Sequence, residues 1–537
     1  MKKATLLLLL ISISCAKKEK VDSIVINGNI YTVNANFDTA EAFAINKGKI
    51  VAVGSNLDIQ KRFSASNIID AKGKTIVPGF FDAHCHFYGL GLQQQKVDLT
   101  GTKSFDEVVQ RIVDFQNKNH VSYITGRGWD QNDWDIKEFP TKQKLDELFP
   151  NTPIAVNRID GHALLANQAA IDLAGITVKT SFSGGDILQK NGKLTGIFID
   201  NPMDLITAKV PKPSKETQIK ALKAAEKICI NYGLTTVDDA GLPREVIELI
   251  DSLQNSGDLK IRMYAMVANT PKDVDYYLKK GIYKTDRLNV RSIKVYADGA
   301  LGSRGAALKK PYSDMHNHFG ALLSSPEEFK KIAKKIAASD YQMNTHAIGD
   351  SANYLMLKTY TDALKGQKDR RWRIEHAQII DPEDFHYFKN ILPSIQPTHA
   401  TSDMYWAKDR IGAERMKGAY AYKDLLNEYG KVALGTDFPV EKVSPFLTFY
   451  AAVARKDLDN YPKKGFQMEN ALTREETLRG MTIWAAYSNF EEKEKGSIEV
   501  GKMADFIILD KDIMKTELSN IPNIKTEATY IGGEKVN

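Results

Sequence analysis

The sequence His84-Cys-His86 is the first arrangement along the chain that could bind a metal ion. It directly follows an apolar strand predicted around Val77. Side chains alternate between the two faces of a strand, so His84 and His86 share one face and Cys85 points to the other. Two imidazoles on one face can bind a single cation. The chain has ten histidines, so two incidental ones could show this spacing, but their place after an apolar strand favours a metal site.

Two further histidines follow predicted strands in the second half of the chain. His346 comes after Gln342–Thr345, and His376 comes after Arg373–Glu375. A lone histidine is more often a satisfied core residue. Together with the His84-Cys-His86 pair, however, these residues place four imidazoles in positions typical of metal ligands.

Lys294 lies in the middle of the apolar strand predicted at Ser292–Tyr296. Burial disfavours the charged ammonium group, so a lysine at this position is costly. One interpretation is an edge lysine that extends its ammonium group to solvent. The other is a desolvated lysine that loses its proton and adds carbon dioxide, which gives a carbamate able to bridge two cations.

Asp437 ends the last strongly apolar strand, in the sequence Gly435-Thr-Asp-Phe-Pro439. An aspartate there could cap the helix that follows. It is also where a general base would face a water molecule activated by a metal ion.

Predicted strands and amphipathic helices alternate through the middle of the chain, and these elements must position the candidate ligands. The helical patterns cover Glu216–Asn231, Ser325–Ser339 and Thr473–Tyr487. Repeated β-then-α order predicts an α/β fold, best described as a distorted (β/α)₈ TIM-type barrel over residues 79–495. Residues from about 93 to 210 break the order, which indicates an insertion after the first barrel strand.

Both ends of the chain carry short β-rich runs, at residues 23–78 and 496–537. The N-terminal runs are separated by turn residues and are typical of a small antiparallel sheet. Neither end has enough strands to bury both of its faces. We therefore expect the two ends to form one small composite β-sandwich beside the barrel.

The first fifteen residues are typical of a signal segment. Met1-Lys-Lys3 precedes an apolar run at residues 4–14, which is too short to cross a membrane but suits a secretory signal. Small residues before Cys15 and a lysine-rich stretch after it resemble a bacterial lipoprotein signal. This predicts lipidation of Cys15 and a membrane anchor in the cell envelope, on the periplasmic or surface side. Ordinary cleavage nearby and an uncleaved anchor remain alternatives.

Composition excludes some classes of protein. The chain has 73 Lys and Arg against 67 Asp and Glu, a formal charge of +6, and these residues are interspersed rather than gathered into a basic stripe. A nucleic-acid partner is therefore not expected. Only two cysteines remain after Cys15, too few for a disulfide framework. The sequence leaves the oligomeric state open.

The order of the candidate ligands resembles the amidohydrolase superfamily. Finer phrases resemble amidohydrolase family 3, the group that contains N-substituted formamide deformylase. These phrases are Asp160-Gly-His162, Ala297–Arg304, His346–Asp350, Gly435–Pro439 and Gly496–Asp505. The resemblance covers the chain from residue 23 to its end and implies a distorted barrel, a composite sandwich and hydrolysis of a C–N bond outside peptides.

The resemblance also implies roles for individual residues. The implied ligands of one or two divalent cations, with zinc expected, are His84, His86, His346, His376 and Asp437. Lys294 would be a carboxylated bridge between two cations, and Asp437 would also be the general base.

Other residues are candidates for contact with the substrate. We expect His162 and Arg304 to hold a developing oxyanion or a substrate anion, although a helix-capping histidine and a surface arginine are equally good interpretations. Trp129, Trp134 and Arg158 are expected to shape the pocket. An aromatic loop of this kind is just as often packing.

The sequence therefore predicts a metal-dependent hydrolase that uses activated water on an amide-type bond of a small molecule. Two alternatives remain open. A ring-amine deaminase would use nearly the same ligands and release ammonia. A lipid-anchored binding protein without turnover would not need Asp437, which is present.

Overall fold

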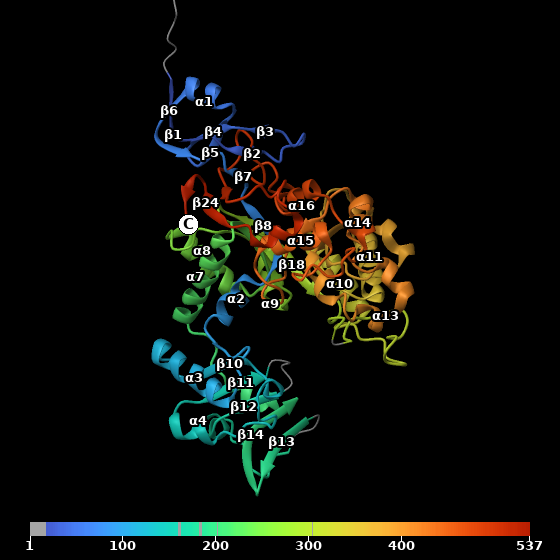
Figure 1. Cartoon of the computed structure of the whole chain (residues 1–537). Helices are drawn as coiled ribbons and strands as arrows, with labels where there is room; N and C mark the ends of the chain where they lie inside the picture. Colours follow the sequence, from blue (N-terminus) through green and yellow to red (C-terminus); the bar gives the residue numbers. More distant parts are fainter. Residues whose placement is uncertain (1–17, 159–162, 182–184, 201, 303) are drawn as a thin grey trace, which may run out of the picture. The chain divides into compact units, whose positions relative to one another are not determined.

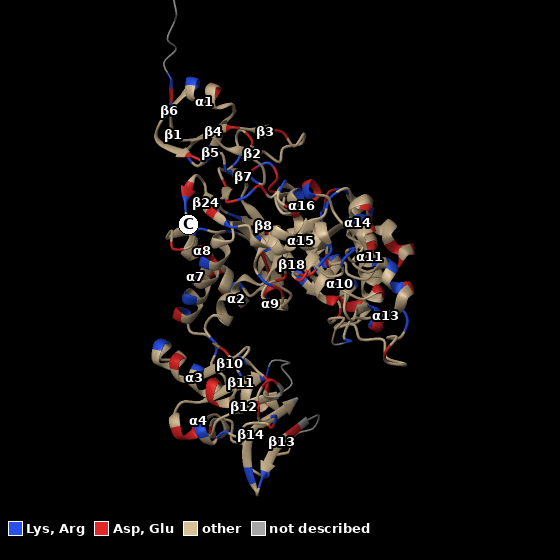
Figure 2. Cartoon of the chain, in the orientation of Figure 1, with Lys and Arg blue, Asp and Glu red and all other residues tan. Residues whose placement is uncertain are grey.

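The computed structural model describes residues 18–158, 163–181, 185–200, 202–302 and 304–537 (Figure 1). The predicted lipidation site Cys15 and the candidate His162 lie outside the described residues. The chain divides into two compact units: Met1–Tyr88 with Glu226–Asn537, and Gly89–Ala225. Charged residues of both signs are interspersed along the described helices, strands and loops (Figure 2). Within the described ranges, no helix is both long and apolar enough to cross a membrane.

A nearly closed barrel of eight parallel strands forms the centre of the first unit, as far as the chain is described. Neighbouring strands pair in sequence order, and a short strand β17 (Tyr283–Lys284) pairs antiparallel with β18. Most barrel residues are buried, as expected for parallel strands covered on both faces. The eight strands are β8 (Phe80–Cys85), β15 (Leu234–Leu242), β16 (Arg262–Ala268), β18 (Leu288–Tyr296), β19 (Gln342–Ala347), β20 (Arg373–His376), β21 (Leu392–Ile395) and β22 (Ala433–Leu434).

Helices follow the barrel strands along the chain, and most of them contact a barrel strand. In the first unit they are α8 (Arg244–Asn255), α9 (Pro271–Lys280), α10 (Pro326–Ala337), α11 (Asp350–Leu364), α12 (Pro397–Asp403), α13 (Ala407–Arg415), α14 (Tyr422–Tyr429), α15 (Pro445–Ala454), α16 (Arg474–Gly480) and α17 (Ile483–Ser488). The single helix predicted over Thr473–Tyr487 is two helices. Thr482, with φ −140° and ψ −96°, lies outside the helical region and breaks the helix between α16 and α17.

The strand that carries the first histidine differs from the prediction. The apolar run at β7 (Thr75–Pro78) belongs to a different sheet, and the barrel strand β8 starts afresh at Phe80, so His84 lies inside its strand rather than after it. Gly79 separates the two strands. A Cβ atom there would lie 2.3 Å from the Thr235 side chain, so only glycine allows this close approach.

Strands from both ends of the chain share one sheet. Its order is β25 (Glu534–Lys535), β24 (Thr526–Ile531), β23 (Phe506–Leu509), β7, β2 (Asn29–Tyr31) and β3 (Thr39–Ala40). A second sheet has the order β5 (Lys49–Gly54), β4 (Ala42–Asn46), β1 (Glu19–Ile26) and β6 (Phe63–Asp70). One cluster of buried side chains includes residues of both sheets, among them Phe43 and Phe506 with ring centroids 5.0 Å apart.

The N-terminal strands do not form the purely antiparallel sheet that the sequence predicted. β1 pairs in parallel with β6, and β2 pairs in parallel with β7. Parallel pairing requires a crossover connection. Helix α1 (Asn56–Arg62) lies in such a connection, between β5 and β6.

The second unit has its own sheet and core. Its strand order is β13 (Gly185–Lys190), β14 (Lys193–Asp200), β12 (Ala163–Ala166), β11 (Ile154–Arg158), β10 (Ile124–Trp129) and β9 (Val97–Asp98). Its helices are α3 (Phe105–Asn119), α4 (Gln143–Leu148), α5 (Gln168–Leu173) and α6 (Met203–Thr207). Helices α2 (Phe87–Gln93) and α7 (Lys215–Asn231) run across the boundaries between the units.

A buried ion pair links the barrel to the C-terminal segment. Arg262 on β16 donates two hydrogen bonds to the Asp505 carboxylate, at 2.7 and 2.9 Å, and both side chains are buried. Removing one partner would leave a buried charge without compensation. We expect Asp505→Ala to lower the free energy of unfolding by about 3–5 kcal/mol, measured by urea unfolding. The matched control is Glu527→Ala, which removes the more exposed ion pair with Lys74 and should cost at most about 1 kcal/mol.

The same ion pair predicts a pH dependence. Burial alone would raise the pKa of Asp505, but Arg262 holds it below its ordinary value. The stabilisation is therefore present above the ordinary carboxyl pKa of about 3.9 and is lost as the pH falls below it. The difference in stability between the wild type and Asp505→Ala should shrink over that acidic range; equal losses from Asp505→Ala and Glu527→Ala at pH 7 would contradict the role of the pair.

Candidate metal centre

Asp437 meets His84 and His86 at the C-terminal end of the first barrel strand. Its Oδ1 lies 3.2 Å from His86 Nε2 and 3.7 Å from His84 Nε2. The backbone N–H of Asp437 donates to the His84 carbonyl oxygen at 2.8 Å, which holds the chain after β22 beside β8. The three ligand atoms lie close enough together to share one cation.

The hydrogen bonds of the two histidines indicate which ring nitrogens face the centre. His84 Nδ1 lies 2.7 Å from Glu375 Oε2, and His86 Nδ1 lies 3.2 Å from the carbonyl oxygen of Ala240. Because both partners are acceptors, each Nδ1 donates to its partner, and each Nε2 is directed at the Asp437 carboxylate. Imidazole nitrogens and a carboxylate are ligands that divalent cations such as zinc accept, so these residues fit a metal ion.

His346 and His376 extend the group of imidazoles. The His376 ring centroid lies 4.9 Å from that of His84 and 4.5 Å from that of His346. Buried nitrogens of both residues, His346 Nε2 and His376 Nδ1, have no hydrogen-bond partner among the described residues. Burial lowers the pKa of His346 to about 3 and that of His376 well below its ordinary value. Both are therefore neutral at pH 7, which is the form that binds metals.

Lys294 is fully buried on β18, with its Nζ 3.1 Å from His84 Nε2. This placement excludes the interpretation in which the lysine extends to solvent. Burial lowers the pKa of Lys294 to about 8, so a neutral amine is accessible near neutral pH. A neutral amine beside the imidazoles has the chemistry required for carboxylation, which stays a prediction.

His399 is a further imidazole at the centre. It lies on α12, with Nε2 3.3 Å from Asp437 Oδ2 and Nδ1 3.2 Å from Glu441 Oε1. His376, His399 and Asp437 form a second group that could hold a cation. Burial alone would lower the pKa of His399, but the hydrogen bonds to Asp437 and Glu441 raise it to about 10.

Comparison with known proteins tests the family directly. A sequence model described as the amidohydrolase family (family 3) matches residues 67–537. The chain belongs to the amidohydrolase family. This confirms the family that the sequence motifs indicated.

Relatives of this amidohydrolase match over nearly its whole length. It is 32% identical to the protein LONG AFTER FAR-RED 3 of Arabidopsis thaliana, over 96% of this chain and 91% of that protein. It is 31% identical to the putative amidohydrolase YtcJ of Bacillus subtilis, over 95% and 98%. It is 26% identical to the N-substituted formamide deformylase of Arthrobacter pascens, over 95% and 97%.

A solved structure supports the same assignment. An uncharacterized metal-dependent hydrolase from Pyrococcus horikoshii superposes on this amidohydrolase with a TM-score of 0.79 and 29% identity, covering 92% of this chain and 99% of that one. Together with the His and Asp group described above, these matches support a metal-dependent hydrolase.

Sequence reasoning missed two side chains at the centre of this amidohydrolase. Glu375 orients His84. The sequence feature that could have indicated this role is an acidic residue inside a buried strand, directly before His376. His399 lies on the first turn of α12, four residues after the end of β21. The pattern of ligands directly at strand ends therefore did not predict it.

The candidates for substrate contact make other contacts in the structure. Arg304 donates two hydrogen bonds to Asp314, at 3.1 and 2.8 Å, and its side chain is about one-third exposed. In the second unit, the Trp129 and Trp134 indoles are buried and donate to backbone carbonyls of Val156 and Thr102. Arg158 pairs there with Asp130. The two indoles thus serve the packing of the second unit.

Proposed function

We propose that this amidohydrolase hydrolyses an amide-type C–N bond in a small molecule rather than in a peptide. The observation that carries the proposal is the position of Asp437, an ionised carboxylate among the five imidazoles of the centre. Burial alone would raise its pKa, but hydrogen bonds with His399 and His86 hold it well below its ordinary value. The similarity to N-substituted formamide deformylase supports the choice of a C–N bond.

The residues present would hold one or two divalent cations, zinc in this proposal. The ligands would be His84, His86, His346, His376 and Asp437, and carboxylated Lys294 would be a further ligand if two metal ions bind. When bound, the metal would acidify a water molecule and polarise the carbonyl oxygen of the substrate.

The protein's own groups would then move the proton. The Asp437 carboxylate accepts a proton from the attacking water and passes it to the leaving nitrogen. His399, held from its other side by Glu441, keeps Asp437 Oδ2 in place. Glu375 fixes the ring of His84 in the same way.

The products of hydrolysis separate this proposal from its rivals. The metal-loaded protein should convert members of a panel of small amides into a carboxylic acid and an amine. Release of ammonia from ring amines, with no hydrolysis of amides, would favour a deaminase. Stable binding of amides or ring amines without any product would favour a non-catalytic binding protein.

We also propose that the protein is anchored to a membrane of the cell envelope through a lipid on Cys15. The layout of the first fifteen residues supports this. Cys15→Ala should abolish incorporation of labelled fatty acid and move the protein out of the membrane fraction, as measured by labelling and fractionation. The matched control is Ser14→Ala, which keeps a small residue before the cysteine and should still be labelled. A wild-type protein that takes up no labelled fatty acid would contradict the anchor.

A further inference from the structure

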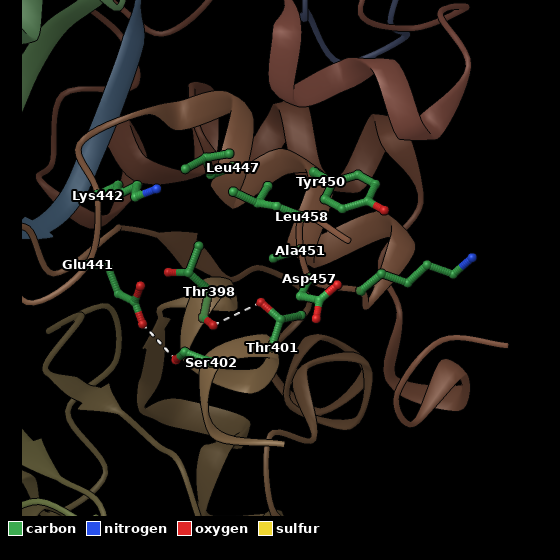
Figure 3. A pocket seen from close by; sticks show the side chains of 11 residues that line it. Thr398, Thr401, Ser402, Glu441, Lys442, Leu447, Tyr450, Ala451, Asp457 and Leu458 are labelled. Atoms are coloured by element: carbon green, nitrogen blue, oxygen red, sulfur yellow. Dashed lines mark hydrogen bonds between the residues drawn. The ribbon is translucent and has the colours of Figure 1, made fainter. Parts of the chain in front are cut away.

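A cavity of about 180 Å³ lies beside the candidate metal centre (Figure 3). Its walls come from α12, from the chain after β22, from α15 and from the chain after α15. The lining residues are Thr398, Thr401, Ser402, Glu441, Lys442, Leu447, Tyr450, Ala451, Lys456, Asp457 and Leu458.

One imidazole ring separates this cavity from the proposed general base. Glu441, in the cavity wall, has its Oε1 3.2 Å from His399 Nδ1. The opposite nitrogen of the same ring, Nε2, lies 3.3 Å from Asp437 Oδ2. Glu441 and Asp437 therefore contact opposite edges of one ring, which places the wall of the cavity one imidazole away from the proposed general base.

The formal charges of the lining select neither an anionic nor a cationic ligand. Two acids and two lysines line the cavity, so its formal charge is balanced. Both acids are already hydrogen-bonded within the protein. Glu441 accepts from Ser402 at 2.7 Å, and Asp457 accepts from the Tyr405 hydroxyl and from the backbone N–H of Tyr461.

Thr398, Thr401, Ser402 and Tyr450 add hydroxyl groups to the lining, but most of the accessible surface of the cavity is apolar, and the cavity opens to solvent. Leu447, Ala451 and Leu458 contribute aliphatic carbon, and Leu458 is also 53% exposed. Tyr405 and Tyr461, which contact Asp457, stack with ring centroids 5.6 Å apart and are more than half exposed. Exposed apolar side chains that gather beside a cavity are typical of a binding site.

We infer that this cavity binds an uncharged hydrocarbon group of the substrate, about the size of one ring or a short alkyl chain. A cavity of about 150 Å³ is large enough to hold benzene, and this cavity is slightly larger. The inference rests on the proposed function, because it assigns the substrate of that same site to amides that carry a hydrocarbon substituent.

The first test measures kcat/KM for amides that carry a methyl, butyl or benzyl group, placed on the acyl carbon in one series and on the nitrogen in another. In one series, kcat/KM should rise about fourfold for each methylene that enters the cavity. Ala451→Leu fills part of the cavity and should lower the butyl-to-methyl ratio at least about tenfold. Leu458→Asp changes an exposed position that tolerates a polar residue, and should lower the same ratio.

Val453→Leu is the matched control, since Val453 lies on the same helix α15 but does not line the cavity. It should keep the wild-type ratio. Unchanged ratios in both Ala451→Leu and Leu458→Asp, or a preference for a substituent that ends in a carboxylate, would overturn the inference.

A binding test separates this inference from the proposed function. Benzyl alcohol, a neutral probe, should bind the metal-loaded wild type in a ligand-observed NMR titration, and Ala451→Leu should weaken binding at least about tenfold. Benzoate, the anionic probe, should bind more weakly than benzyl alcohol. If no amide is hydrolysed but benzyl alcohol binds as expected, the proposed function fails and the hydrocarbon site stands. Benzyl alcohol binding that Ala451→Leu leaves unchanged, or tighter binding of benzoate, would overturn the site.

Discussion

Asp437→Asn is expected to lower turnover by at least about 100-fold, the usual scale for loss of a general base. Asparagine keeps the size of the side chain but cannot accept the proton from the attacking water. The loss should persist in samples reloaded to the wild-type metal content, because the four proposed histidine ligands remain in place. Steady-state kinetics on an amide from the panel, with metal analysis of the same samples, measures both quantities.

An aspartate away from the centre provides the control for this change. Asp275 forms an exposed ion pair with Lys335, so Asp275→Asn should leave both turnover and metal content unchanged. Near-normal turnover in Asp437→Asn at full metal content would assign the general base to another residue.

Lys294→Ala is expected to remove metal and activity together if the lysine is carboxylated. The carbamate carries a negative charge between two cations, so its loss should reduce the metal content from about two ions per chain. Acetate or bicarbonate should partly restore both properties by occupying the place of the carbamate. Metal analysis, kinetics with and without these acids, and a structure of the metal-loaded enzyme test the prediction.

Another buried lysine offers a matched control. Lys495 is 4% exposed and pairs with Glu491 at 3.0 Å, away from the metal ligands. Lys495→Ala should lower stability without changing the number of metals per chain. If Lys294→Ala keeps its metal and most of its activity, the carbamate is absent. One metal per chain would then leave His84, His86, His346 and Asp437 as a mononuclear site, and the ring-amine deaminase would become the better hypothesis.

The parallel barrel was predictable because its signals are local. The runs Ser292–Tyr296 and Gln342–Thr345 have the length of one buried strand, and strands β18 and β19 form there. The boundary between the N-terminal sheet and the first barrel strand was harder to predict. Thr75–Pro78 and Phe80–Cys85 read as one apolar stretch, but a close contact at Gly79 divides them between two sheets.

The types of the candidate ligands and their places at or near strand ends could be predicted from the amino-acid sequence, because side-chain alternation and burial patterns depend on neighbouring residues. The groups that hydrogen-bond to these ligands or bury them are visible only in the folded structure. Glu375 and His84 lie 291 residues apart in the chain, and their contact exists because β8 and β20 belong to one barrel. Likewise, His399 contacts Asp437 because α12 places it beside the carboxylate. Lys294 is buried because neighbouring elements of the fold cover it. Such contacts depend on the closure of the whole barrel, which no local pattern encodes.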